Sequence, residues 1–273
     1  MEVPYKNLYI YYLKGHADTK NLAFNVDFLG NWEEGGYSFL FFSTPSKDKL
    51  AYILDVQNDL TFIDEYKFSY EEWHGCKISS QNIGKFFIVP PWDNIKNSDE
   101  KISIILDPGV VFGNGTHPTT SDCIYAIEEV FFLDKINSAM DIGTGTGILS
   151  LAIAKLSSKK TIAVDFNFLA AKTAMKNVQL NNLKDKIIVI CGRGEDYVDI
   201  PCDLLVANIH YDIMKELIKS KGFWSKKWLI LSGLFRSQAK DIENQLLAKK
   251  AQIVRTWETS SIWNTFLIKN TFT

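Results

Sequence analysis

The fold of this chain is decided by the stretch MDIGTGTGIL at residues 140–149, where an apolar run leads into three alternating glycines and then into a helical pattern. Glycine reaches positive φ freely and lets backbone come close to a ligand. A helix that begins directly after such a turn presents unpaired N–H groups. Ligands of open α/β sheets bind at the carboxyl ends of the strands. The stretch therefore predicts a strand, a ligand-binding turn and a helix.

The spacing of the glycines distinguishes two classes of nucleotide-type cofactor. A dinucleotide fingerprint requires G-x-G-x-x-G, and its third position is Ile148 in this chain. Gly143, Gly145 and Gly147 instead follow the alternating pattern of S-adenosylmethionine sites, where no pyrophosphate has to be held. Asp165, 22 residues after Gly143 and at the end of the next predicted strand, can accept hydrogen bonds from both ribose hydroxyls. The alternative is a plain strand–turn–helix with a solvated aspartate.

Strand and helix patterns alternate from residue 102 onward, which predicts a doubly wound, mostly parallel sheet. Strands are predicted at 102–106, 139–142, 161–165, 187–190, 203–207, 228–231, 253–257 and 262–268. Helices are predicted at 120–131, 148–156, 169–180, 212–219 and 237–249. The last two strands are joined by four residues, 258–261, which is too short for a parallel crossover. We therefore expect that pair to be antiparallel.

The chain divides into three parts by composition. Residues 1–63 predict a small α+β domain, with a strand at 8–13, a helix from Asp18 or Thr19 to Gly30, and strands at 37–42 and 51–56. Residues 64–82 are acidic and aromatic and predict a linker helix. The remainder, 83–273, opens with a short strand that ends at two prolines, residues 90 and 91, because proline cannot donate to a ladder.

Two further segments carry residues suited to a site. The segment LDPGVVFGNGTHPTT, residues 106–120, predicts a structured loop that could fold over a ligand, with Thr119 or Thr120 capping the next helix. His117 in this loop either serves the site or bonds backbone. The segment LLVANIHY, residues 204–211, places Asn208 at the end of a main strand, where its side-chain oxygen can accept from an amine. Alternatively, Asn208 caps the helix that follows.

Together these three segments resemble the PrmA family, methyltransferases that modify the eleventh protein of the large ribosomal subunit. The family's loop reads close to LDPGxAFGTGTHPTT, and DIGTGTGIL and LSGLFRSQ (231–238) also match in order and spacing. The resemblance covers about residues 70–270. It implies a Rossmann-like, seven-stranded class I methyltransferase sheet preceded by a small ferredoxin-like domain that recognises the substrate.

Carried over by position, the resemblance implies cofactor-binding residues at Thr120, Gly143, Asp165 and Asn208, with Gly145 in the same turn, and no metal. Asn208 would also hold the acceptor nitrogen.

The chain departs from the family at two places. Asn114 replaces the family's usual threonine, and Asn-Ile-His-Tyr at 208–211 replaces Asn-Ile-Leu-Ala. The second departure makes Tyr211 a candidate wall of the acceptor pocket, suited to a planar acceptor, and makes His210 a candidate base. The alternative is that Tyr211 turns outward as the first residue of the next helix.

The predicted function is methylation of lysine or amino groups of a ribosomal protein from S-adenosylmethionine. One alternative is an enzyme of the same fold that acts on another protein or on a small-molecule nitrogen. Another is a protein that binds the cofactor without turnover, which the intact glycine turn, Asp165 and Asn208 argue against.

Composition limits the kinds of protein that this chain can be. The 273 residues suggest about two domains. Lysine and arginine number 30 against 32 aspartates and glutamates, so the chain lacks a basic footprint and we expect no direct nucleic-acid binding. Charged residues interrupt every apolar run before the roughly 18 residues of a membrane span. The spacing of the cysteines fits no zinc pattern and predicts reduced thiols in a cytoplasmic protein. They are Cys76, Cys123, Cys191 and Cys202.

Overall fold

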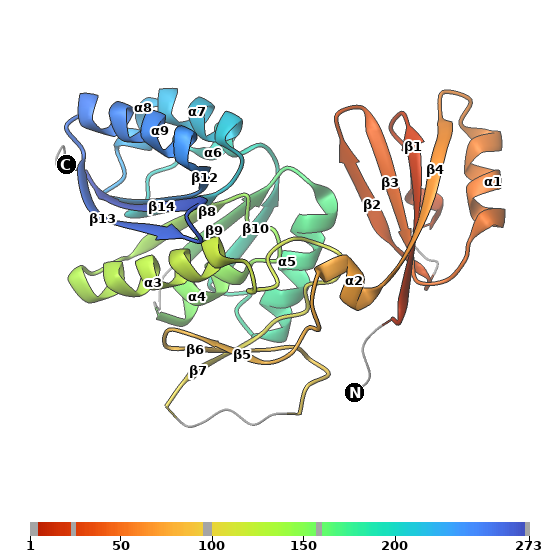
Figure 1. The fold of residues 1–273 in the computed structure, drawn as a ribbon, viewed down its shortest axis with the longest axis horizontal. Helices are drawn as coiled ribbons and strands as arrows, with labels where there is room; N and C mark the ends of the chain where they lie inside the picture. The colour runs from red at the N-terminus through yellow and green to blue at the C-terminus, as the bar shows by residue number, and fades with distance from the viewer. Residues whose placement is uncertain (1–4, 23–25, 95–99, 157–159, 271–273) are drawn as a thin grey trace.

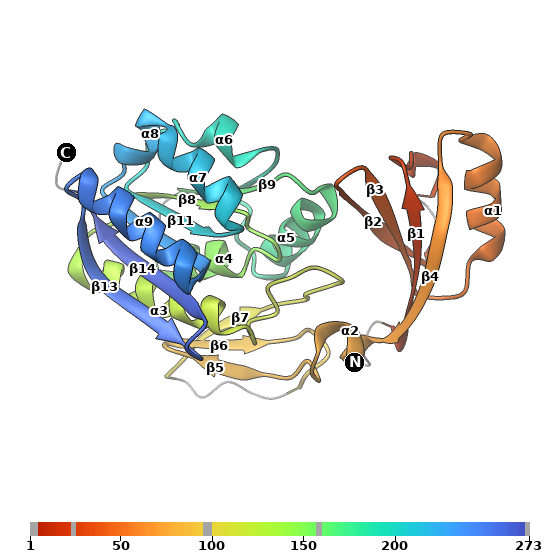
Figure 2. The same ribbon diagram turned by 45° about the horizontal axis from the view of Figure 1, so that its top comes forward.

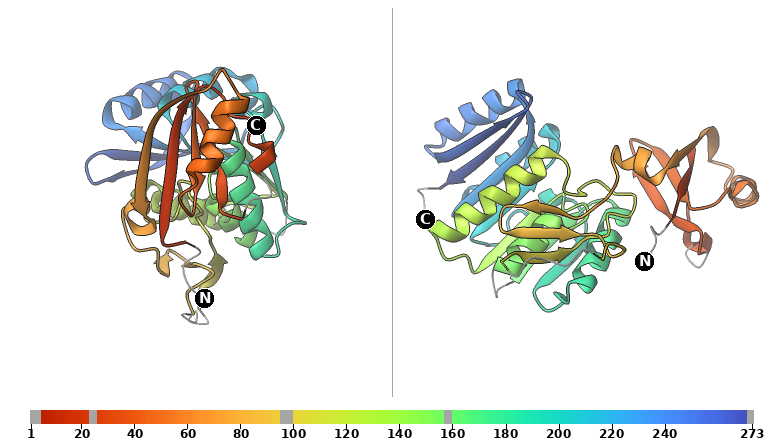
Figure 3. Two further views of the ribbon diagram at one scale, coloured as in Figure 1. Left: turned by 90° about the vertical axis from the view of Figure 1, so that its right-hand side faces the viewer. Right: turned by 60° about the horizontal axis from the view of Figure 1, so that its bottom comes forward.

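The computed structural model describes residues 5–22, 26–94, 100–156 and 160–270. Figure 1 shows an antiparallel sheet from the start of the chain at one end of the molecule and a larger α/β body at the other. A small three-stranded sheet lies against the larger body, seen at the front in the right-hand view of Figure 3. This division confirms the predicted fold class, an α/β body with a small N-terminal α+β domain.

The N-terminal domain is a four-stranded antiparallel sheet in the order β2-β3-β1-β4. Its helix α1 covers the outer face (Figure 3, left). This order is the ferredoxin-like arrangement that the sequence predicted. The elements are β1 (Asn7–Lys14), the 3-10 helix η1 (Lys20–Leu22), β2 (Phe28–Glu34), β3 (Tyr37–Phe42), α1 (Lys47–Val56) and β4 (Thr61–Ser69).

Two predicted elements of this domain were wrong. The helix expected up to Gly30 is a single 3-10 turn, and Gly30 lies inside β2, where a side chain would overlap Leu169 of the larger body. Part of that expected helix, residues 23–25, lies outside the described residues. The strand expected at 51–56 belongs to α1, because Leu50 and Ile53 recur at helical spacing and pack on the sheet.

The linker helix predicted at 64–82 was also wrong in extent. Residues up to Ser69 form β4, which pairs with β1 and completes the first sheet. Helix α2 (Tyr70–His74) follows, with Ser69 as its N-cap and Gly75 in the left-handed region at its end. The boundary at residue 63 therefore falls within a strand, because pairing with β1 outweighs the acidic composition of the segment.

The larger body contains a seven-stranded sheet in the order β10-β9-β8-β11-β12-β14-β13, in which β14 runs antiparallel to both of its neighbours, β12 and β13. Its strands are β8 (Ser138–Ile142), β9 (Lys160–Asp165), β10 (Ile187–Cys191), β11 (Leu204–Asn208), β12 (Trp228–Phe235), β13 (Gln252–Thr259) and β14 (Trp263–Lys269). The predicted antiparallel ending is confirmed. The strand expected at 102–106 instead joins the three-stranded sheet of β5 (Gln81–Ile83), β6 (Phe86–Val89) and β7 (Ile102–Ile105).

Helices cover both faces of the seven-stranded sheet (Figures 1 and 2). One face carries α3 (Pro118–Leu133), α4 (Ile148–Leu156) and α5 (Phe168–Leu180) over one apolar cluster. The other carries α6 (Gly194–Tyr197), α7 (Tyr211–Lys219), α8 (Lys221–Trp224) and α9 (Arg236–Ala248) over a second. Across the described ranges, no helix is long and apolar enough to span a membrane.

A separate apolar cluster joins the two parts of the molecule. Leu8, Ile10 and Phe41 of the N-terminal sheet pack with Val110 and Leu169 of the body. Since Val110 belongs to the 106–120 loop, this contact places the N-terminal sheet beside the loop that borders the site.

Candidate active site

The glycine turn between β8 and α4 is fixed to the neighbouring strand. The backbone N–H groups of Gly143 and Thr144 both donate to the carbonyl of Val164, at 2.8 and 3.0 Å. Gly143 and Gly145 have φ angles of 72° and 55°, in the region that favours glycine. The turn is therefore held at the carboxyl edge of the sheet, as the sequence predicted.

Other backbone and side chains approach this turn closely. A Cβ at Gly143 would overlap Cγ2 of Ile209, and a Cβ at Gly145 would lie 2.8 Å from the carbonyl oxygen of Phe112. Thus the residue after Asn208 and the 106–120 loop both reach the glycines. A side chain at either position would displace them.

Asp165 ends β9 beside the turn. Its Oδ2 accepts from the N–H of Gly145 at 2.9 Å, and its Oδ1 accepts from the N–H of Asn167 at 3.0 Å. The side chain is buried, and burial raises the pKa of its carboxyl. A carboxylate has about four acceptor positions, so each oxygen keeps capacity for a further donor. Asp165 therefore shapes the turn and remains able to bind a hydroxyl.

A second buried carboxylate lies beneath the turn. Oδ2 of Asp141 accepts from Thr144 Oγ1 at 2.6 Å and from the N–H and Oγ of Ser150 at 3.1 and 2.7 Å. Oδ1 is buried and has no hydrogen-bond partner within the described residues. Burial raises the pKa of Asp141, and the nearby charge of Asp165 raises it further. Two buried carboxyls at one strand edge favour a ligand that carries positive charge.

The 106–120 loop packs directly on the glycine turn. Asn177 of α5 accepts from the N–H of Asp107 at 2.8 Å and donates to the carbonyls of Asp107 and Thr146, each at 2.9 Å. Thr146 Oγ1 in turn donates to the carbonyl of Gly113 at 2.7 Å. One buried asparagine therefore ties the loop, α5 and the turn together.

Asn208 is the last residue of β11, and its Nδ2 donates to Thr119 Oγ1 at 3.2 Å. It does not cap the next helix, because His210 occupies that N-cap. The caps expected at Thr119 or Thr120 were also wrong. His117 caps α3, and the ring Nδ1 accepts from the N–H of Thr119 at 3.4 Å. Pro118 was the available signal, since proline favours the first helical position.

The structure places Thr120 and Thr119 differently. Thr120 is buried within the first turn of α3, whereas Thr119 is the residue that contacts Asn208. The sequence alone did not distinguish the two, because both lie in the same HPTT segment.

Aromatic rings surround His117 beside Asn208. The imidazole lies edge-on to Phe112, with ring centroids 5.3 Å apart, and to Trp263 of β14, at 4.9 Å. Trp263 is stacked on Phe235 at 4.6 Å. Burial lowers the pKa of His117, which favours the neutral ring. Sequence reasoning missed this ring cluster because nothing local connects positions so far apart in the chain.

Tyr211 and His210 lie apart from this arrangement. Tyr211 begins α7, and its hydroxyl donates to Asp241 of α9 at 2.8 Å. Its ring packs on the apolar cluster of the α7–α9 face, whereas Asn208 points to α3 on the opposite face. His210 is exposed. These contacts match the alternative in which Tyr211 turns outward.

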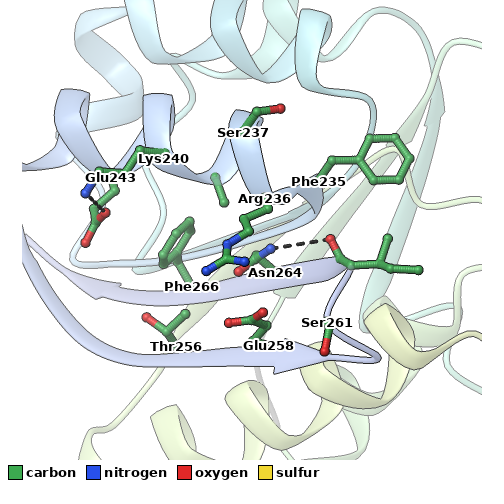
Figure 4. Close-up of a pocket in the computed structure, with 12 residues that line it drawn as sticks. Phe235, Arg236, Ser237, Lys240, Glu243, Thr256, Glu258, Ser261, Asn264 and Phe266 are labelled. Atoms are coloured by element: carbon green, nitrogen blue, oxygen red, sulfur yellow. Dashed lines mark hydrogen bonds and ion pairs between the residues drawn. The ribbon is translucent and has the colours of Figure 1, made fainter.

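An open groove of about 800 Å³ lies between α9 and the β13–β14 hairpin. Phe235 lines the groove and is stacked on Trp263, so the groove adjoins the rings around His117. Arg236 extends from α9 toward the strands that carry Asn264 and Glu258 (Figure 4). The α9 wall thus carries Arg236 and the ion pair of Lys240 with Glu243, and the β13 wall carries Glu258.

The residues at the sheet edge fit S-adenosylmethionine. That molecule carries a sulfonium and an ammonium, and positive charge beside the unpartnered oxygen of Asp141 and the buried carboxyl of Asp165 would favour their ionised forms. Within the described part of the chain, no group of three or more histidine, cysteine or acidic side chains could hold a metal ion. All four cysteines are free, although Cys191 is exposed rather than buried.

Comparison with known proteins identifies relatives of this chain by sequence. The family model for "Ribosomal protein L11 methyltransferase (PrmA)" matches residues 58–271. A ribosomal protein L11 methyltransferase of Alkaliphilus metalliredigens is 35% identical over 73% of this chain and 64% of its own length. The corresponding protein of Anoxybacillus flavithermus is 34% identical over 81% of this chain and 71% of its own. The chain therefore spans about two thirds of the length of these relatives.

A solved structure agrees with these sequence relatives. The ribosomal protein L11 methylase of Lactobacillus delbrueckii subsp. bulgaricus has a TM-score of 0.60 and 28% identity, and the match covers 70% of this chain and 98% of that one. The likeness therefore includes the three-dimensional fold.

Proposed function

The chain belongs to the ribosomal protein L11 methyltransferase (PrmA) family, and from this we propose that it transfers methyl groups from S-adenosylmethionine to amino groups of a ribosomal protein. The observation that carries the proposal is the meeting of the glycine turn, Asp165 and Asn208 at one edge of the sheet. All three belong to segments in which the chain matches the family.

The residues around the turn would hold the cofactor. We propose that Asp165 accepts from the ribose hydroxyls and that the glycine backbone lies against the amino-acid part, with Thr120 supporting the 106–120 loop. Asp141 would offset positive charge from below the turn. When bound, S-adenosylmethionine supplies a methyl carbon made electrophilic by its sulfonium.

The acceptor nitrogen must arrive neutral and correctly aimed. A lysine with an ordinary pKa of about 10.4 loses its proton at pH 7 at a cost of about 4–5 kcal/mol. Desolvation among Phe112, Trp263 and Phe235 lowers that cost, because burial disfavours the ammonium. Asn208 Oδ1 would accept one N–H of the neutral amine and so orient its lone pair. Positioning of this kind is the main catalytic contribution that methyl transfer requires.

Two surfaces would bind the rest of the substrate. The N-terminal domain, which ends with β4, is proposed to recognise the ribosomal protein, since it borders the site without contributing to the glycine turn. The groove beside Phe235 would take the polypeptide flanking the acceptor. Such a substrate would be met in the cytoplasm.

The test is incubation with methyl-labelled S-adenosylmethionine and purified ribosomal proteins, followed by mass spectrometry. We expect label on a single large-subunit protein, and a matched Asp165→Ala sample at a limiting concentration of S-adenosylmethionine should show much less. The same reaction in an extract would reveal a different acceptor. Label on another protein or on a small molecule, with the ribosomal proteins unlabelled, would overturn the substrate assignment and leave the methyltransferase assignment standing.

A further inference from the structure

A hydrogen-bonded series of three polar side chains, from His117 through Thr119, ends at Asn208. Asn208 Nδ2 lies 3.2 Å from Thr119 Oγ1, and Thr119 Oγ1 lies 2.7 Å from His117 Nδ1. Thr119 is 1% exposed, so solvent competes little for its hydroxyl. The rings of Phe112 and Trp263 hold the imidazole edge-on from two sides. The contacts therefore connect the start of α3 to the end of β11.

The direction of the hydrogen bonds in this series of three side chains follows from the role of His117 as the N-cap of α3. In the Nε2–H tautomer of His117, Nδ1 is an acceptor and can take the backbone N–H of Thr119 at 3.4 Å. In this tautomer the Thr119 hydroxyl donates to the same nitrogen at 2.7 Å, which leaves its lone pairs free for the amide of Asn208. The NH2 group of Asn208 is thereby engaged, and its Oδ1 lies on the side of Gly233, 3.1 Å from where a Cβ at that glycine would stand.

We propose that Thr119 and His117 are positioning residues that set which way the Asn208 carboxamide faces; this rests on the proposed methyl transfer to an amine. The orientation matters because a neutral amine attacks through its lone pair. Oδ1 accepts an N–H and leaves that lone pair free. A flipped carboxamide would present NH2 instead, which donates to the lone pair and blocks attack.

The experiment compares four variants of the full chain. Thr119→Val keeps the shape and removes the hydroxyl, and Thr119→Ser restores it. His117→Phe keeps a ring between Phe112 and Trp263 and removes the acceptor, whereas His117→Asn keeps an acceptor and a good helix cap. The matched control is Thr173→Val, because Thr173 is also buried and its hydroxyl also donates, to the carbonyl of Leu169.

We expect Thr119→Val and His117→Phe to lower kcat about three- to tenfold, the range that one neutral hydrogen bond supports. Affinity for S-adenosylmethionine should stay within about twofold of wild type, since the series from His117 to Asn208 is proposed to act on the acceptor amine. Thr119→Ser, His117→Asn and Thr173→Val should keep the wild-type kcat. Equal loss in Thr119→Ser and Thr119→Val, or no loss in either, would overturn the proposal.

A second readout is independent of turnover. The side-chain amide of Asn208 gives a ¹H–¹⁵N NMR signal, assigned with Asn208→Asp. Its signal should move in Thr119→Val and His117→Phe and stay in place in Thr119→Ser. If the wild type labels no acceptor, the proposed function fails while this spectrum still decides the orientation. An unmoved signal in all variants refutes the positioning role.

Discussion

Replacing Gly143 by alanine would measure how tightly the cofactor turn is enclosed. The residue has a φ of 72°, and holding alanine in this left-handed region costs about 1–2 kcal/mol. The new methyl would also overlap Cγ2 of Ile209, and overpacking of this kind costs about 1–3 kcal/mol. We therefore expect the free energy of unfolding to fall by about 2–5 kcal/mol. Ile209 follows Asn208 directly, so its displacement should also weaken binding of S-adenosylmethionine.

A double-mutant cycle separates the two terms. Ile209→Ala removes Cγ2, whereas Ile209→Val keeps both branches on Cβ, so only the alanine relieves the overlap. In urea unfolding, Gly143→Ala should couple to Ile209→Ala by about 1–3 kcal/mol and to Ile209→Val by almost nothing. Titration calorimetry on the same proteins reports the cofactor affinity. Equal coupling to both partners, or a Gly143→Ala protein within about 0.5 kcal/mol of wild type, would refute the steric account.

Four other perturbations address the site. Asp165→Ala should weaken S-adenosylmethionine binding at least about tenfold by calorimetry, because a hydrogen bond to a carboxylate is lost, and wild-type affinity would exclude the ribose role. Burial raises the pKa of Asp165, so its stabilising contribution is present below the unfolded pKa and falls as the pH rises through the folded one. As the pH rises, the urea midpoint of wild type should therefore fall relative to that of Asp165→Asn. A difference between the two midpoints that does not change with pH would contradict this. Tyr211→Ala should leave kcat/KM and cofactor affinity of the folded protein unchanged, because the ring packs on the α7–α9 face and its hydroxyl binds Asp241; a fall in kcat/KM would return the ring to the acceptor pocket. Arg236→Ala and Glu258→Ala should raise KM for the ribosomal protein without altering cofactor affinity, and an unchanged KM would place the substrate elsewhere.

The turn proposed to hold the cofactor was predictable because its signals are local. A strand, three alternating glycines and a helix in MDIGTGTGIL determine the turn, and Asp165 follows from the next strand's end. The alternation of strands and helices likewise determines the parallel sheet, and the four-residue link before Ile262 determines its antiparallel ending. The N-terminal domain was predicted less well. Its segment at 51–56 has residues that suit a strand, yet packing of Leu50 and Ile53 against the sheet made it a helix.

The acceptor half was decided by tertiary structure. Asn208 and Thr119 are 89 positions apart, and they meet because β11 and α3 pack at the same edge of the sheet. Trp263 reaches His117 from the antiparallel strand β14, and Tyr211 is drawn away to Asp241 of α9. Sequence periodicity determines which face of an element is apolar, but not which distant side chain it will face. Which hydroxyl meets the amide of Asn208 depends on how α3 seats on the sheet, and only the packed structure decides that.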